Sequence, residues 1–190
     1  MADFISSYSQ NFYSRPTLEV ARDLLGAILC RRISRNQILS GPIVELEAYT
    51  ADDPACHAFR GRTARTSVMF GPPGHAYVYF IYGMYFCLNV VTEPEGIPGA
   101  ILIRAVGADG TNGPGKLCRE WQINRSHNGL SLFEPGSKLW ICPGQPVPDS
   151  HIITTPRVGI SSAQDRPWRF YLRDHPAVSG SRNGPGARRR

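Results

Sequence analysis

Hydrophobic positions along the chain predict one early helix followed by strands. Between Pro16 and Cys30, apolar residues recur every three or four positions, which is the spacing of an amphipathic helix. A proline suits the first turn of such a helix because it has no N–H to donate. From Gln37 to Tyr49 the pattern changes to alternation with β-branched residues. This segment predicts either a strand pair or one bent strand, interrupted at Gly41-Pro42.

The segment that ends at Tyr49 has two chemically different faces. Successive side chains of a strand point to opposite sides, so Glu45, Glu47 and Tyr49 share one face. The opposite face is apolar and consists of Val44, Leu46 and Ala48. Exposed glutamates are common, so the pattern alone favours a solvated strand edge for the two carboxylates. A catalytic interpretation stays open, because a carboxylate beside aromatic side chains can activate water.

The strongest strand signal is a pair of aromatic-rich runs, Tyr77–Tyr82 and Tyr85–Val91, joined near Gly83. Two such runs around a glycine predict a β-hairpin with Tyr82 near its tip. Tyrosines that alternate along a strand are most often core residues, so alternation assigns no function to the other tyrosines. An aromatic ring at a hairpin tip is harder to explain as core. Tyr82 is therefore a candidate for contact with a ligand.

Shorter elements complete the expected fold. The polar segment 50–76 is rich in turn signals and predicts a functional loop with at most about one helical turn. Further elements are a strand at 100–106, a short helix at 115–123 and strands at 139–142, 157–160 and 168–172. Together they predict an α+β fold in one domain, residues 1–178. Residues 179–190 are nearly free of apolar side chains and contain four arginines, so we expect a disordered basic tail.

Composition narrows the possible classes of protein. The chain has 190 residues, 42% of them hydrophobic, which suffices for one compact domain with its own core. No apolar run approaches the length that spans a bilayer, and the N-terminus lacks the features of a secretory signal. We therefore expect a protein inside the cell that makes no membrane contact. Five scattered cysteines, an odd number, argue against a disulfide scaffold.

Charge and short motifs exclude some chemistry. The net charge is +6, and only Lys116 and Lys138 among the 21 basic residues are lysines. Arginine suits phosphate, although net charge alone does not prove a nucleic-acid partner. The segment Gly110–Lys116 nearly matches a phosphate-binding loop, but Leu117 stands where a serine or threonine would hold magnesium. The five histidines show no metal-ligand spacing, so we expect no metal site and no cofactor.

Motifs of one known family occur in order along nearly the whole chain, from about Phe12 to about Ser179. They are IVELEAY at 43–49, His57, MFGPPG at 69–74, YVYFIYGMYFCLNV at 77–90, ILIR at 101–104, NGPGKLC at 112–118 and RFYL at 169–172. With these motifs the chain resembles the alkyladenine DNA glycosylases, also called methylpurine-DNA glycosylases. The tyrosine-rich hairpin is the most specific part of the resemblance.

The resemblance implies a fold and a reaction. The fold would be a curved antiparallel sheet with a protruding hairpin and peripheral helices. The protein would flip alkylated or deaminated purines out of double-stranded DNA and hydrolyse their bond to the sugar, in base excision repair. Substrates of this type are 3-methyladenine, 7-methylguanine, hypoxanthine and ethenoadenine. It would act as a monomer, in the cytoplasm or nucleoid of a prokaryote or the nucleus of a eukaryote.

By the same resemblance, individual residues acquire expected roles. Glu47 would deprotonate the water that attacks the sugar, and Arg104 would help to hold the water and the carboxylate. The flipped base would stack between Tyr49 on one side and His57 with Tyr79 on the other. We expect a monofunctional glycosylase without lyase activity. A lyase step normally needs an amine nucleophile, and the chain has only two lysines, Lys116 and Lys138, to supply one.

Three further residues would contact the duplex or the base. Tyr82 would fill the space that the flipped nucleotide leaves in the stack, and Met84 would flank this wedge. Asn89 would form part of the pocket wall and discriminate against the exocyclic amino group of normal guanine. The arginines of the polar loop are candidates for phosphate contacts, or equally for a solvated loop: Arg60, Arg62 and Arg65.

Two other classes of function remain open from the sequence. A non-catalytic module that recognises distorted DNA is compatible with the basic charge and the exposed aromatic residues. Such a module has no use for a carboxylate such as Glu47 facing a phosphate-rich ligand. A hydrolase of small sugars or nucleosides would keep Glu47 but would give Tyr82 no role. These two residues therefore separate the three hypotheses.

Overall fold

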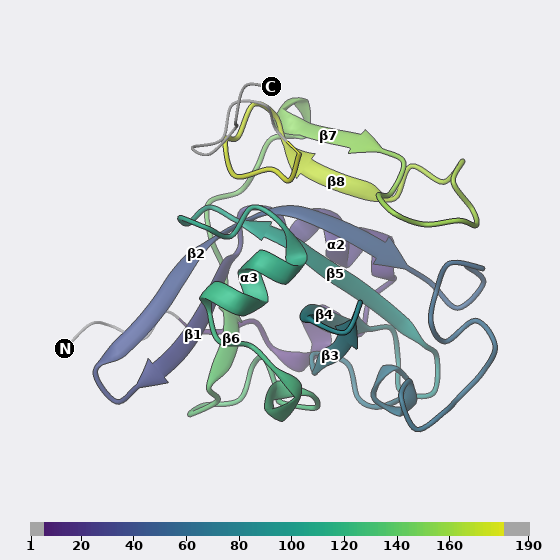
Figure 1. Ribbon diagram of the computed structural model, residues 1–190, viewed down its shortest axis with the longest axis horizontal. Coiled ribbons are helices and arrows are strands. Elements are labelled where there is room, and N and C mark those ends of the chain that lie inside the picture. The colour runs from purple at the N-terminus through teal and green to yellow at the C-terminus, as the bar shows by residue number, and fades with distance from the viewer. Residues whose placement is uncertain (1–5, 181–190) are drawn as a thin grey trace.

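The computed structural model describes residues 6–180 and shows strands with a few short helices (Figure 1). The strands are β1 (Ile28–Ser34), β2 (Gln37–Tyr49), β3 (Ala76–Ile81), β4 (Tyr85–Thr92), β5 (Gly99–Val106), β6 (Leu139–Cys142), β7 (Ile152–Thr155) and β8 (Arg169–Leu172). The α-helices are α1 (Gln10–Tyr13), α2 (Thr17–Asp23) and α3 (Pro114–Glu120), and the 3-10 helices are η1 (Ser67–Phe70), η2 (Arg125–His127) and η3 (Asp149–His151).

The strands form one curved antiparallel sheet. Six of them follow the order β3-β4-β5-β2-β1-β6, and β8 pairs with both β2 and β7 (Figure 1). Helix α2 packs against β2 and β5, and α3 packs against β4 and β5. This arrangement confirms the predicted fold class, an α+β domain around a curved antiparallel sheet with peripheral helices.

Strand β2 joins the two parts of the sheet. Its first half pairs with β1, from Gln37 to Pro42, and its second half pairs with β5 and β8. The register against β5 shifts on both sides of Glu45. Such bulges bend a strand and increase its twist. Of the two predicted alternatives, one bent strand is the observed one, and Gly41-Pro42 lies within it.

The two faces of β2 and β5 meet different surroundings. Leu46 and Ala48 of β2, with Ile101 and Ile103 of β5, are 0% exposed and belong to the main hydrophobic core. The core also contains buried residues of α2 and of the strands β3 and β4: Val20, Ala21, Val78, Leu88 and Val90. Residues that alternate with these point to the other side of the sheet. The predicted separation of polar and apolar faces is therefore confirmed.

The helix predicted over Pro16–Cys30 is wrong beyond Asp23. Helix α2 ends there, and Ile28 opens strand β1, which pairs with β2 on one side and β6 on the other. The turn between them needs Gly26, whose φ is +80° and where a Cβ would lie 2.7 Å from a backbone oxygen of Gln145. Apolar spacing in this stretch fits a helix and a buried strand equally well, and pairing with two neighbouring strands decides between them.

The strand predicted at 157–160 is also wrong, because the strand β7 lies earlier, at Ile152–Thr155. Arg157 instead forms a buried ion pair with Asp53, and the backbone N–H of Val158 donates to Glu47. These two contacts hold residues 157–158 against the face of β2 that carries Glu47, instead of in a strand. The strands predicted at 139–142 and 168–172 are confirmed as β6 and β8, and the predicted short helix at 115–123 is α3, which ends at Glu120.

The end of the domain contacts the sheet. Ser179, the first residue of the predicted tail, donates its backbone N–H to Glu45 across 2.6 Å. Of the other residues of the predicted tail, the structure describes Gly180, and residues 181–190 lie outside the described part of the chain. The described chain therefore stays in contact with β2 as far as Ser179.

Candidate active site

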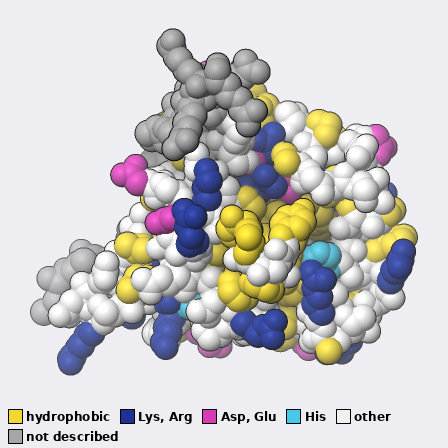
Figure 2. All heavy atoms as spheres, viewed as in Figure 1, with side chains coloured by type: hydrophobic (Ala, Val, Ile, Leu, Met, Phe, Trp, Pro, Cys, Tyr) yellow, Lys and Arg dark blue, Asp and Glu magenta, His cyan; other side chains and the backbone are white. Residues whose placement is uncertain are grey.

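A pocket of about 480 Å³ opens on the face of the sheet that does not contact the main core. Hydrophobic side chains gather in a hollow near the middle of this side of the molecule, with a histidine and basic side chains at its margin (Figure 2). Seven of the polar and aromatic residues that line it come from distant parts of the chain: Glu47, Tyr49, His57, Tyr77, Tyr79, Asn89 and Arg104. Strands β2, β3, β4 and β5 and the loop after β2 thus bring them to one place.

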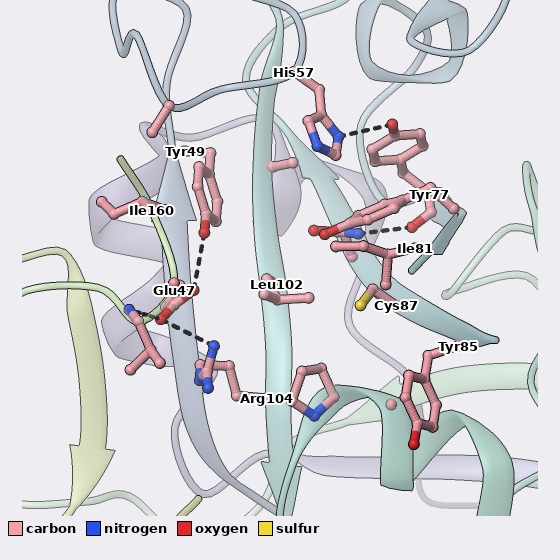
Figure 3. Close-up of a pocket in the computed structure, with 18 of the residues that line it drawn as sticks. Glu47, Tyr49, His57, Tyr77, Ile81, Tyr85, Cys87, Leu102, Arg104 and Ile160 are labelled. Carbon is pink, nitrogen blue, oxygen red and sulfur yellow. Dashed lines mark hydrogen bonds and ion pairs between the residues drawn. The ribbon is translucent and has the colours of Figure 1, made fainter. Parts of the chain in front are cut away.

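Glu47 lines the floor of the pocket and is completely buried, with 0% of its surface exposed. Its Oε1 accepts the backbone N–H of Val158 at 2.7 Å and lies 3.1 Å from Nη1 of Arg104. Its Oε2 accepts the hydroxyl of Tyr49 at 2.9 Å (Figure 3). The solvated strand edge that the pattern favours is wrong for this carboxylate, because Arg104 of β5 and Val158 of the loop after β7 cover it together with Tyr49 of β2.

Glu45, two residues earlier, is equally buried and lies behind the pocket rather than in its lining. Its Oε1 accepts Nε of Arg104 at 2.8 Å and Nε of Arg169 at 2.7 Å. Two carboxylates therefore face two guanidinium groups, which balances the buried charge. A buried carboxylate requires such partners, since its desolvation is otherwise costly.

Arg104 connects the two carboxylates and is only 7% exposed. Burial by itself lowers the pKa of its guanidinium, but the carboxylates of Glu47 and Glu45 more than compensate, and the pKa lies above its usual value. The side chain is thus a permanent cation held at the floor of the pocket. Cations at this position can hold an anionic oxygen or orient a water molecule.

Tyr49 forms an aromatic wall above Glu47. Its hydroxyl points to the carboxylate (Figure 3). The guanidinium carbon of Arg157 lies 4.6 Å from the centre of the Tyr49 ring. Burial, followed by the negative charge of Glu47, raises the pKa of this phenol well above its usual range. Tyr49 therefore stays neutral and remains a hydrogen-bond donor to Glu47.

The opposite wall consists of three aromatic rings. The ring of His57 lies 4.6 Å from that of Tyr79, and Nδ1 of His57 is 3.1 Å from the hydroxyl of Tyr77 (Figure 3). Loss of solvent around the imidazole, followed by the charge of Arg65, lowers the pKa of His57 to about 4. The imidazole is therefore neutral at physiological pH. Together with Tyr49, these rings bound a slot that suits a flat, aromatic group.

The remaining predicted residues lie on the hairpin of β3 and β4. Tyr82 sits in its turn, 80% exposed and with φ of 53°, and lines the pocket rim, whereas Met84 is 65% exposed and lies outside the lining. Asn89 is buried in the pocket wall, where its side-chain nitrogen donates to the backbone oxygen of Tyr77 at 3.0 Å. All the predicted site residues except Met84 therefore line one pocket.

Sequence reasoning missed several contributors to this site. The buried pair Asp53–Arg157 joins residues 104 positions apart, and neither lies in a motif that marks it. Arg169 belongs to the RFYL motif at the start of β8, but nothing in that motif reveals its ion pair with Glu45. The contribution of Val158 is a backbone N–H, which no side-chain pattern encodes.

The part of the chain that the structure describes shows neither a cluster of metal ligands nor a membrane-spanning helix. Among residues 6–180, no three His, Cys, Asp or Glu side chains come together as metal ligands would. In the same range no helix has the length and the apolar character to cross a bilayer. The pocket is therefore the feature on which a functional argument rests.

Comparison with known proteins identifies the family. The chain matches the sequence model of the methylpurine-DNA glycosylases over residues 11–110 and 107–176. Three similar proteins, each named "Putative 3-methyladenine DNA glycosylase", come from Wolbachia sp. subsp. Brugia malayi (strain TRS), Synechococcus sp. (strain JA-3-3Ab) and Methanocella arvoryzae. The Wolbachia protein is 51% identical over 173 residues, which cover 86% of this chain and 95% of the relative. The Synechococcus protein is 46% identical over 188 residues, which cover 87% of this chain and 95% of the relative. The Methanocella protein is 46% identical over 199 residues, which cover 93% of this chain and 96% of the relative. The chain therefore belongs to the methylpurine-DNA glycosylase family of hydrolases, which act on N-glycosyl bonds in DNA.

Proposed function

We propose that this protein removes alkylated or deaminated purines from double-stranded DNA by flipping the damaged nucleotide into the pocket and hydrolysing its bond to the sugar. The observation that carries the proposal is a buried carboxylate, Glu47, at the floor of a slot between aromatic walls. Extrusion is required because the reacting carbon is inaccessible within the base stack. The names of the relatives agree with 3-methyladenine as one substrate.

Glu47 acts as the general base in this proposal. Its Oε2 accepts one hydrogen bond, from Tyr49, so a lone pair of that oxygen is left for a water molecule. The water attacks the anomeric carbon, its proton passes to Glu47, and the bond electrons leave with the purine. Arg104, held 3.1 Å from Oε1, keeps the carboxylate in place and helps to orient the water.

The aromatic slot selects the base. A cationic 3- or 7-alkylpurine stacks favourably on electron-rich rings such as Tyr49 and Tyr79. The neutral imidazole of His57 adds no positive charge against such a base. A cationic purine also leaves without further protonation, so a single carboxylate suffices for its release. Asn89, in the pocket wall, discriminates against the exocyclic amino group of normal guanine.

The hairpin tip engages the duplex. Tyr82 fills the space of the extruded nucleotide and Met84 flanks it, which offsets part of the cost of unstacking. Both side chains are largely exposed, as a wedge requires. One chain supplies every group named here, so a monomer suffices, and the bacterial and archaeal origin of the relatives points to action on the nucleoid.

The replacement Glu47→Gln tests the proposal. We expect the variant to lose excision by at least about 100-fold, the typical contribution of general-base catalysis, and to keep its affinity for damaged duplex. The measurement is single-turnover release of hypoxanthine, ethenoadenine and 7-methylguanine from duplexes that carry one lesion, with a chelator present.

An exposed glutamate supplies the matched control. Glu134→Gln makes the same chemical change on the surface and should retain the wild-type rate. Equal rates for wild type and Glu47→Gln would remove the assigned role of this carboxylate. Tight binding of damaged DNA without release by the wild type would instead favour a non-catalytic module that recognises distorted DNA.

A further inference from the structure

Each nitrogen of the Arg104 guanidinium has its own partner. Nε donates to Glu45 at 2.8 Å, Nη1 pairs with Glu47 at 3.1 Å, and Nη2 donates to the hydroxyl of Ser179 at 3.1 Å. A planar guanidinium held at three points has a single orientation, because rotation about any bond breaks at least one contact. The position of Arg104 against Glu47 therefore depends on the two partners that lie outside the pocket.

Ser179 holds both Arg104 and the carboxylate behind it. Its backbone N–H donates to Oε2 of Glu45 at 2.6 Å, and its hydroxyl lies 2.8 Å from Oε1 of the same residue. The hydroxyl thus lies between Glu45 and Nη2 of Arg104, where it can donate to the carboxylate and accept from the guanidinium. Arg169 completes the cluster with its own ion pair to Glu45 at 2.7 Å.

Ser179 contacts Arg104 from outside the pocket. It lies after β8 in a segment without regular structure, 75 residues from Arg104 in the sequence, and it is not part of the pocket lining. The preceding residue, Val178, is 7% exposed and anchors the segment. Among its partners only Arg104 lines the pocket, so Ser179 influences hydrolysis through Arg104, either directly or by way of Glu45 behind it.

We propose that Ser179 is a positioning residue for hydrolysis, which closes the cluster behind the pocket and holds Arg104 in the orientation that pairs with Glu47. The inference rests on the proposed function, in which Glu47 and Arg104 act on the attacking water. It adds that the C-terminal end of the domain belongs to the catalytic apparatus. Without the hydroxyl, Nη2 of Arg104 loses its anchor and the pairing with Glu47 becomes less well defined.

The experiment separates the chemical step from DNA binding in the full-length chain. Ser179→Ala removes the hydroxyl contacts to Glu45 and Arg104 and should lower the single-turnover rate of base release roughly 10-fold, because hydrogen bonds to charged groups contribute about 1.5–3 kcal/mol. Its Kd for the same lesion duplex and its melting temperature should stay close to those of the wild type. Ser179→Thr keeps a hydroxyl and should restore most of the rate. Ser150→Ala, an exposed serine without contact to the cluster, is the control.

Every outcome bears on the inference. A Ser179→Ala variant with the wild-type rate overturns it, and so does a variant whose rate, affinity and melting temperature fall together, because that pattern indicates a merely structural role. Failure of Ser179→Thr to recover more rate than Ser179→Ala also overturns it. If the wild type releases none of the tested bases, the proposed function fails, whereas an active wild type with an equally active Ser179→Ala contradicts this inference alone.

Discussion

At the scale of single residues, burial distinguishes Glu45 and Glu47 from ordinary surface glutamates. Alternation along β2 places Glu45 and Glu47 on one face but cannot say whether that face is wet or dry. The structure encloses both carboxylates and supplies Arg104 and Arg169 as counter-charges. Groups that are buried and paired at the floor of a pocket are characteristic of active sites.

His57 gives a prediction about pH. Its pKa is about 4 in the folded protein, below the value of about 6.5 for an unperturbed histidine. Between these two values the unfolded chain binds a proton that the folded chain does not, so His57 lowers stability as the pH falls from about 6.5 to about 4. We expect His57→Gln to show a weaker loss of stability than the wild type when urea unfolding is compared at about pH 7.5 and about pH 5.

The comparison of wild type with His57→Gln contains an internal control. His127 and His175 also have lowered pKa values and stay in both proteins, so only the difference between the two pH dependences reports on His57. An NMR titration of the wild type should show the His57 ring still neutral at about pH 5. Identical pH dependences, or titration near the unperturbed value, would contradict the environment described for this residue.

At the scale of elements, the hairpin of β3 and β4 combines strain with exposure. Tyr82 adopts φ of 53°, which a non-glycine residue rarely does, although 80% of its surface is exposed and gains nothing from packing. Strain that burial does not compensate is typical of functional positions. The hairpin therefore presents this ring to solvent rather than to the core, as the proposed wedge requires.

The wedge role predicts a substrate-dependent effect of Tyr82→Ala. Stacking on an aromatic side chain contributes about 1–3 kcal/mol per base, so we expect base release from duplex DNA to fall by roughly 10-fold or more. Release of the same lesion from single-stranded DNA should change little, because no partner strand has to be kept apart. The measurement is the ratio of single-turnover rates on the two substrates.

Ile38→Ala is the control for that prediction, since Ile38 is another exposed apolar side chain, 44% exposed, at the start of β2 and next to the turn from β1. It should leave both rates unchanged. A Tyr82→Ala variant that slows both substrates equally would argue against a wedge. It would indicate instead that the ring contributes to the pocket, whose rim it lines.

At the scale of the whole molecule, one buried ion pair connects the two loops that bound the pocket. Asp53 lies in the loop that carries His57, and Arg157 precedes Val158, whose N–H holds Glu47. Arg157 also donates to the backbone oxygen of Ala48 at 2.9 Å, and both charged side chains are 0% exposed. The pair thus links the loop after β2 to the loop after β7.

Asp53→Asn tests this connection. The change leaves the Arg157 cation buried without a counter-charge, which typically costs about 3–5 kcal/mol. For a domain of this size, the melting temperature should fall by roughly 2–4 °C for each kcal/mol. Thermal unfolding of the purified variant gives the measurement directly.

The neighbouring Asp52→Asn is the matched control. Asp52 pairs with Arg166 at 3.3 Å, but its side chain is 75% exposed, and surface ion pairs contribute little to stability. This variant should melt close to the wild type. Equal melting temperatures for the two variants would show that the buried pair is not a structural connection.

What the sequence determined by itself follows from local rules. Alternation separated the two faces of β2, aromatic runs around Gly83 defined the hairpin, and the ordered motifs indicated the family and seven of the residues that line the pocket. These features depend on residues close together in the chain, where the period of two and turn chemistry apply directly.

Only the tertiary structure decided the rest. Residues 28–30 became a strand because β2 and β6 lie on either side of them, although their spacing also fits a helix. The strand expected at 157–160 gave way to contacts with Asp53 and Glu47. The cluster of Glu45 with Arg104, Arg169 and Ser179 joins positions far apart in the chain. Burial and charge pairing are properties of the folded assembly, and no local pattern contains them.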